Sequence, residues 1–146
     1  VLTDSTFLKC ACYLDLSSSN MEKTKFIRCL IKFDKNNNNI DFSFSTFKNS
    51  EIEFQRVKKS KFQYTKFINT KIIGIDFTSC DFRNVLFSRC LIEGSKFINC
   101  DLTNSIFKRV YIKKHRSYLK PTTIDKKWYA HLKRQRIRGF HRIKWK

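Results

Sequence analysis

Most of the residues that could do chemistry lie near the C-terminal end of the sequence, where they form a dense group of cations. Residues 113–146 contain 13 Lys and Arg but only one acid, Asp125, so this segment holds +12 of the chain's net charge of +19. Cationic side chains neutralise phosphates and release their counterions, while aromatic rings placed among them can stack on exposed bases. The composition of this tail therefore predicts a nucleic-acid partner.

The predicted contacts fall into two groups. The side chains expected to contact phosphates are Lys113, Lys114, Arg116, Lys126, Lys127, Lys133, Arg134, Arg136, Arg138, Arg142, Lys144 and Lys146. The aromatic residues expected either to stack on bases or to cover the end of the preceding fold are Trp128, Tyr129, Phe140 and Trp145. The two roles are compatible, because one face of the tail can cover the fold with Trp128 and Leu132 while the other binds.

The six cysteines and three histidines do not form a recognisable catalytic or metal-binding pattern. Cys10 and Cys12 form a Cys-x-Cys pair with no second pair at zinc-like spacing, and the histidines lie far away in the tail, flanked by Lys or Arg. No Ser, Cys or carboxylate is placed beside them to make a nucleophile. The sequence therefore predicts a protein that is not an enzyme and that has no catalytic residue, metal or cofactor.

The remaining cysteines favour a reducing environment. Cys80, Cys90 and Cys100 recur every ten residues and are expected to be buried, reduced thiols that act as small hydrophobic side chains. Free thiols in this number predict an intracellular compartment, with a mitochondrion or plastid as a plausible organelle. No apolar run approaches the length of a membrane span or a signal-peptide core.

The element that must position the tail is a stretch with an apolar residue at every fifth position. The series runs without a slip through Phe42, Phe47, Ile52, Val57, Phe62, Phe67, Ile72, Phe77, Phe82, Phe87, Ile92, Phe97, Leu102, Phe107 and Ile112. Two residues before each stands a second series of mostly small or β-branched residues, such as Ser60, Thr65 and Thr70. Neither an α-helix nor a flat strand has this period.

A period of five is explained if each unit forms one side of a square coil, with both series pointing inward. Stacked coils would then pair their backbones about 4.8 Å apart, and each coil would bury its face on its neighbours. The sequence is identified as a member of the pentapeptide-repeat family on the units Cys80-Asp81-Phe82, Cys100-Asp101-Leu102, Ile75-Asp76-Phe77 and Ile40-Asp41-Phe42.

This resemblance implies an all-β solenoid, a right-handed quadrilateral β-helix over residues 1–112. Phenylalanine replaces the leucine that is commoner in the family, so we expect an aromatic core made of Phe42, Phe47, Phe62, Phe67, Phe77, Phe82, Phe87, Phe97, Leu102 and Phe107. The family's Asp usually helps to order a corner, which is the role expected of Asp76, Asp81 and Asp101.

Two segments interrupt the pattern. The frame shifts near residues 33–39, where the run Asn36 to Asn39 offers no apolar side chain and predicts a loop protruding from one corner. After residue 112 a basic extension begins, and Pro121 argues against a continued ladder. Thr122 and Asp125 resemble a capping box, and Gly139 could end a helix, so we expect a helix at about 124–138 and an extended end.

The leading functional hypothesis is a scaffold or assembly protein that binds RNA, most plausibly ribosomal RNA, beside neighbouring proteins of a large ribonucleoprotein such as an organellar ribosome. The alternative is a protein-interaction module, an accessory subunit of a membrane complex or a bacterial effector, that docks on an acidic protein or an anionic membrane surface. A third hypothesis is modulation of topoisomerase, the family's best-known activity. It requires a DNA-like acidic surface, which a chain of charge +19 does not present.

Overall fold

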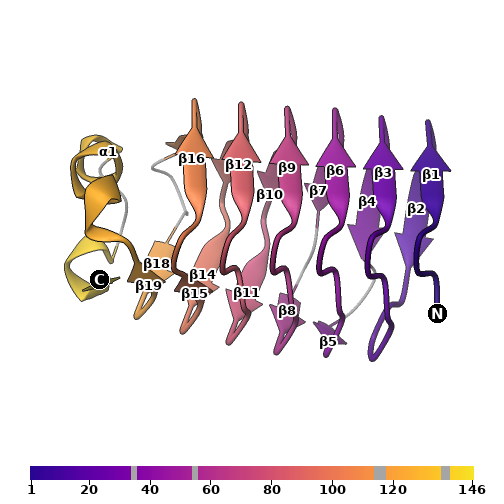
Figure 1. Cartoon of the computed structure of the whole chain (residues 1–146), viewed down its shortest axis with the longest axis horizontal. Helices are drawn as coiled ribbons and strands as arrows, with labels where there is room; N and C mark the ends of the chain where they lie inside the picture. Colours follow the sequence, from indigo (N-terminus) through magenta and orange to yellow (C-terminus); the bar gives the residue numbers. More distant parts are fainter. Residues whose placement is uncertain (34–35, 54–55, 114–117, 136–138) are drawn as a thin grey trace.

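The chain forms a four-sided parallel β-solenoid, with its N-terminus at one end of the stack and a short helix at the other (Figure 1). The structure is a computed structural model that describes residues 1–33, 36–53, 56–113, 118–135 and 139–146. The coils contribute short strands or single bridges to the walls, and successive coils pair in parallel. The predicted solenoid architecture is confirmed.

The walls follow one another in chain order. The first wall contains β1 (Thr6–Leu8), β3 (Lys25–Ile27), β6 (Thr46–Lys48), β9 (Lys66–Ile68), β12 (Leu86–Ser88) and β16 (Ile106–Lys108). The second contains β2 (Ala11–Leu14), β4 (Leu30–Phe33), β7 (Glu51–Glu53), β10 (Lys71–Ile73), β13 (Leu91–Glu93) and β17 (Tyr111–Lys113). The third contains β5 (Asn36–Asn38), β8 (Arg56–Lys58), β11 (Asp76–Thr78), β14 (Lys96–Ile98) and β18 (Tyr118–Lys120). The fourth begins as single bridges between coils and ends in β15 (Asp101–Leu102), β19 (Thr123–Ile124) and β20 (Lys144–Trp145).

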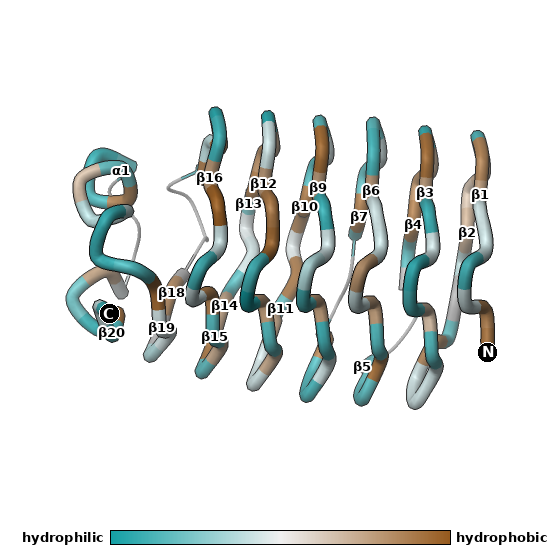
Figure 2. The backbone as a smooth tube through the Cα atoms, viewed as in Figure 1, coloured by the Kyte–Doolittle hydropathy of each residue, from teal (hydrophilic) through white to brown (hydrophobic). Residues whose placement is uncertain are grey.

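The core consists of columns of phenylalanine rings. Along the first wall, the centroids of Phe47 and Phe67 lie 5.0 Å apart, and those of Phe67 and Phe87 lie 5.2 Å apart. Rings of different walls meet edge to face, as Phe77 does with Phe82 at 4.9 Å and 88°. All ten predicted core residues are buried. Figure 2 shows the resulting recurrence of hydrophobic segments along the walls from coil to coil.

The small inward residues complete the core by satisfying backbone groups. The hydroxyl of Thr65 donates to the carbonyl of Phe42 at 2.7 Å, and that of Thr70 donates to the carbonyl of Phe47 at 3.0 Å. Each bond joins a coil to the preceding one. A buried hydroxyl therefore costs little here, because it has an acceptor at a fixed position in every turn of the stack.

Several corners use residues that tolerate a left-handed backbone. Asn49, Asn69, Gly74 and Gly94 have φ values of 53°, 49°, 67° and 62°. Glycine has no Cβ to clash in this region, and asparagine is the side chain that tolerates it next best. These residue types suit the sharp turns at their own corners, whereas other corners place Arg28, Phe44, Tyr64 or Arg89 in the same region.

The predicted corner role of aspartate holds for two of the three residues. The carboxylates of Asp81 and Asp101 accept hydrogen bonds from the backbone N–H two residues ahead, at 3.0 and 2.9 Å. The carboxylate of Asp76, on strand β11, pairs instead with the Lys96 ammonium of the next coil at 3.2 Å. Asp76 has the same position in its five-residue unit as Asp81 and Asp101, but its unit lies on a different side of the coil.

The prediction of a protruding loop near residues 33–39 is wrong for the asparagines, because Asn36–Asn38 form strand β5. The Asn37 side chain is fully buried, and its Oδ1 accepts a hydrogen bond of 2.8 Å from the N–H of Leu16. An inward slot can thus hold an amide when a neighbouring coil supplies a donor. The frame shifts are absorbed by coils of unequal length. Phe7 pairs with Phe26, which follows 19 residues later, and Phe26 pairs with Phe47, which follows 21 residues later.

Replacing Asn37 by Ala should lower the free energy of unfolding by about 1–3 kcal/mol, because a buried backbone donor loses its acceptor. Urea denaturation followed by circular dichroism measures the change. The matched control is Asn38→Ala on the same strand, whose side chain is partly exposed and which should leave the urea midpoint nearly unchanged. Equal effects of the two changes would show that the inward position of Asn37 carries no special role.

The ladder also continues beyond the point where the sequence pattern stops. Strand β18 pairs with β14, β19 with β15, and β20 with β19, so Pro121 lies at a corner between two strands instead of ending the sheet. The buried residues Leu119 and Ile124 stand five positions apart, a restart of the period that the sequence analysis missed. The basic extension is consequently built into the stack.

The helix of the extension is shorter than the predicted 124–138. A 3₁₀ turn, η1 (Lys126–Trp128), leads into α1 (Tyr129–Arg134), and a second 3₁₀ turn, η2 (Phe140–Arg142), follows. Ile124 belongs to a strand, and Thr122 is buried with its hydroxyl bonded to the carbonyl of Phe97 at 2.8 Å, so it does not cap a helix. None of the helices in the described ranges combines the length and hydropathy needed to cross a bilayer.

Candidate nucleic-acid interface

Helix α1 covers the C-terminal end of the solenoid (Figure 1). Leu132 points into the core and is fully buried. The Trp128 indole meets the ring of Phe107 edge to face at 5.3 Å, and its Nε1 donates to the carbonyl of Ser105 at 2.9 Å. Trp128 and Leu132 thus lie against the last coil, in the position that a cap requires. We call the described residues 122–135 and 139–146 the basic cap.

Two polar side chains fix the basic cap to open backbone groups of the last coil. Gln135 Nε2 donates to the carbonyl of Val110 at 2.9 Å, and Gln135 Oε1 accepts from the N–H of Ile112 at 3.0 Å. Asp125 Oδ2 accepts from the N–H of Asn104 at 2.8 Å. Sequence reasoning missed Gln135, because a lone glutamine among cations gives no signal that it will take the place of a missing strand.

The other three aromatic residues of the basic cap form a group of their own. Ring centroids of Tyr129, Phe140 and Trp145 lie between 5.1 and 5.4 Å apart. Phe140 and Trp145 are partly buried against the core, whereas Tyr129 is 40% exposed. The Lys133 ammonium lies 5.5 Å from the Tyr129 ring centroid. Among these predicted stacking residues, Tyr129 keeps the most surface for contact with a base.

The cations of the basic cap are exposed, and the carboxylates near them are few. The exposed members are Lys126, Lys127, Lys133, Arg134, Arg142, Lys144 and Lys146. Lys127 lies 3.8 Å from the carboxylate of Asp125, and the other six have no ion pair among the described residues. Their charge is therefore available to an external anion.

The rest of the predicted phosphate-contacting residues lie elsewhere. Lys113 is on strand β17 of the second wall, where its ammonium pairs with Glu93 at 2.8 Å, so it is already neutralised. The last four predicted contacts, Lys114, Arg116, Arg136 and Arg138, fall outside the described residues.

The buried cysteines are free thiols, as the sequence predicts. Cys80, Cys90 and Cys100 are buried in inward slots, and burial raises the pKa of Cys90 to about 11. Its protonated thiol donates to the carbonyl of Phe67 at 3.2 Å. In the first coils, Cys10 Sγ lies 3.1 Å from both Cys12 Sγ and Cys29 Sγ. Within the described part of the chain, no three His, Cys, Asp or Glu side chains are grouped to hold a metal ion.

Comparison with solved structures finds other pentapeptide repeat proteins. Rfr23 from the cyanobacterium Cyanothece 51142 is 7% identical, with a TM-score of 0.31, over 82% of this chain and 87% of that one. A pentapeptide repeat protein of the Arabidopsis thaliana thylakoid lumen is 16% identical, with a TM-score of 0.29, over 81% and 73% of the two chains. A structure of trypsin-treated QnrB1, a plasmid-mediated fluoroquinolone resistance protein, is 18% identical, with a TM-score of 0.25, over 79% and 86%.

Comparison of the sequence itself is more specific. A search of curated proteins finds no match. The model of the family described as "Pentapeptide repeat region" matches residues 19–97, which is more than half of the 146-residue chain. This match covers the coils whose inward phenylalanines build the core. The chain belongs to the pentapeptide repeat family.

Proposed function

We propose that this protein is a non-enzymatic scaffold that binds RNA within a large ribonucleoprotein, such as an organellar ribosome, through its basic cap. The observation that carries the proposal is the group of six exposed cations that have no ion pair within the described ranges, on an element fixed to a rigid stack. Cations held in place lose less conformational entropy on binding than cations on a free tail do. The cap thus presents a preorganised surface to phosphates.

The aromatic residues of the basic cap also suit an RNA partner. Tyr129 is exposed with the Lys133 ammonium near its ring, so a base could stack on the ring while cations of the basic cap contact the adjoining phosphates. An anionic membrane would make less use of this surface. Leu132, Phe140 and Trp145 already pack against the core or one another, so the described part of the basic cap leaves no apolar face to enter the acyl chains.

Reversing two of these charges with Lys133→Glu and Arg134→Glu should weaken RNA binding about tenfold at 0.1 M salt, because two phosphate contacts become repulsive. Fluorescence anisotropy with a labelled single-stranded oligoribonucleotide and the full-length protein measures the affinity. The dependence of log Kd on log salt should also become shallower by about 1.4, since each phosphate contact on a single strand contributes about 0.7.

A matched control is the pair Arg56→Glu and Lys58→Glu, which makes the same change of charge on strand β8 of the third wall. These residues have no ion pair among the described residues. The control should bind RNA almost as the wild type does. Wild-type protein that ignores RNA but floats with phosphatidylserine vesicles, or that binds RNA weakly and without salt dependence, would overturn the proposed function.

A further inference from the structure

The first wall differs from the other three in its charge. The strands β1, β3, β6, β9, β12 and β16, together with the corner that follows each, carry eight exposed cations and no acid. We call this surface the basic wall. Its cations are Lys9, Lys25, Arg28, Lys48, Lys66, Arg89, Lys108 and Arg109.

Each of the other walls carries acids as well as cations and holds ion pairs, although the third wall also keeps Arg56 and Lys58 without an ion pair among the described residues. The second wall holds the pairs Lys71–Glu51, Lys32–Glu53 and Lys113–Glu93 at 3.2, 2.9 and 2.8 Å. The third holds Lys96–Asp76 at 3.2 Å, and the fourth holds Lys61–Asp41 and Arg83–Asp81 at 3.2 and 2.6 Å. In the described parts of the chain, none of the eight cations of the basic wall has such a partner. Their mutual repulsion is an unrelieved cost unless an anion lies against the wall.

From these observations we infer that the basic wall is a second nucleic-acid-binding surface, on which a polynucleotide backbone lies along the axis of the stack. Six stacked strands separated by about 4.8 Å span about 24 Å. A base-stacked single strand with the rise of one strand of B-form DNA, about 3.4 Å per phosphate, would place about seven phosphates along this length. The number of phosphates is close to that of the cations. The inference rests on the proposed function, because it assigns a further surface to the same class of partner.

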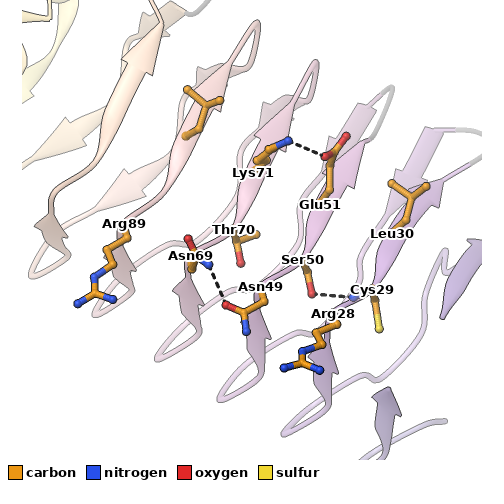
Figure 3. A pocket seen from close by; sticks show the side chains of 11 residues that line it. Arg28, Cys29, Leu30, Asn49, Ser50, Glu51, Asn69, Thr70, Lys71 and Arg89 are labelled. Carbon is orange, nitrogen blue, oxygen red and sulfur yellow. Dashed lines mark hydrogen bonds and ion pairs between the residues drawn. The ribbon is translucent and has the colours of Figure 1, made fainter. Parts of the chain in front are cut away.

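The corner after the basic wall offers hydrogen-bond donors that a phosphodiester chain can use. A groove of about 580 Å³ runs along it, and Figure 3 shows Arg28 and Arg89 at its two ends with Asn49 and Asn69 between them. Asn69 Nδ2 donates to Asn49 Oδ1 at 2.9 Å, which orders the two amides. Arginine offers several donors in a fixed plane that matches phosphate geometry.

The corner before the basic wall offers flat rings. Phe44 and Tyr64 stack with centroids 5.0 Å apart at 4°, yet their side chains are 52% and 50% exposed. Both have positive φ and project from successive corners. Exposed rings beside a line of cations are what single-stranded nucleic acid uses for base stacking. This pair is the reason for favouring a single strand over a duplex on this wall.

A lipid surface fits the basic wall less well. Its strongly exposed aliphatic side chains are Leu8 at 59% and Ile106 at 41%, and these stand on β1 and β16, the first and last strands of the wall. Apolar residues at opposite ends of the stack form no continuous face that could enter a bilayer.

The double variant Lys48→Glu and Lys66→Glu tests the inference with the full-length protein. It should bind a labelled single-stranded oligoribonucleotide about tenfold more weakly at 0.1 M salt, with a log–log salt slope reduced by about 1.4. The Arg56→Glu and Lys58→Glu variant, with the same charge change on the opposite wall, is the control and should lose less than twofold. Urea denaturation should give the wild-type midpoint for both variants, because all four side chains lie on the outside of the stack.

Three outcomes decide against the basic wall, and they separate its failure from that of the proposed function. Equal losses in both variants would mean that net charge alone attracts RNA, which removes the wall as a site. Loss of binding in the Lys133→Glu and Arg134→Glu variant with unchanged binding in Lys48→Glu and Lys66→Glu would overturn the wall and leave the basic cap in place. Wild-type binding to polyglutamate or phosphatidylserine vesicles without binding to RNA would overturn both. A duplex of equal length, bound more tightly than the single strand, would remove the role of Phe44 and Tyr64.

Discussion

Phe62→Ala should lower the free energy of unfolding by about 3–5 kcal/mol, the range for emptying a buried phenylalanine site. The Phe62 ring is only 2% exposed and stacks on Phe42 and Phe82, with centroids 5.3 and 4.6 Å away. Loss of the ring leaves both neighbouring coils facing a cavity that a parallel ladder cannot close. Since a domain of this size is stable by about 5–15 kcal/mol in total, the change removes a large part of its stability.

The exposed corner residue Phe44 provides the matched comparison for Phe62. Phe44→Ala deletes the same atoms, but the ring is half exposed and stacks on the half-exposed ring of Tyr64, so we expect a loss of about 0.5–1.5 kcal/mol. Urea denaturation followed by circular dichroism gives both values. Equal losses would mean that the fifth-position rings are not the dry interior of the solenoid.

Leu132→Ala should cost about 2–5 kcal/mol and act chiefly at the C-terminal end of the stack. Leu132 is fully buried, whereas helix α1 has six residues, too few to be stable by itself in water. The helix is therefore held by its packing on the last coil. When that packing is weakened, Gln135 should also lose its bonds to Val110 and Ile112.

Native-state hydrogen exchange provides the local measurement for Leu132→Ala. The amide of Ile112 donates to Gln135 Oε1 at 3.0 Å, so its protection should fall more than that of amides in the central coils, such as the Lys66 N–H. The control is Lys133→Ala, the exposed neighbour on the same helix, which should leave protection unchanged. Unchanged exchange at Ile112 in Leu132→Ala would show that the cap does not depend on this side chain.

The regular part of the fold was predictable because the apolar residue at every fifth position determines the shape of the coil. Phe47, Phe67, Phe87 and Phe107 recur every twenty residues and can share a wall only in a four-sided coil. Asn37 was not predictable from the same rule, because a polar residue enters an inward slot only when another coil offers a donor, here Leu16. That donor is a property of the packed stack, and the local sequence does not reveal it.

The sequence predicted which types of residue form the candidate sites better than it predicted where those residues lie in the fold. Charge density pointed to the tail, and the capping role of Trp128 and Leu132 followed from their separation by one helical turn. The basic wall was missed, since Lys48 and Lys66 stand apart in the sequence and come together only when the coils are stacked in register. A count of outward residues by wall, after the period was known, would have found it.

The uneven first coils have a consequence for how such a chain can change in length. Phe7, Phe26 and Phe47 lie in one column although the intervals between them are 19 and 21 residues. Corners thus absorb the loss or gain of a single residue, whereas the same change inside a three-residue strand would reverse which side chains face inward. Duplication of the gene segment for one whole coil would lengthen the solenoid by one coil and extend every wall together with its charge. The existing coils would keep their packing.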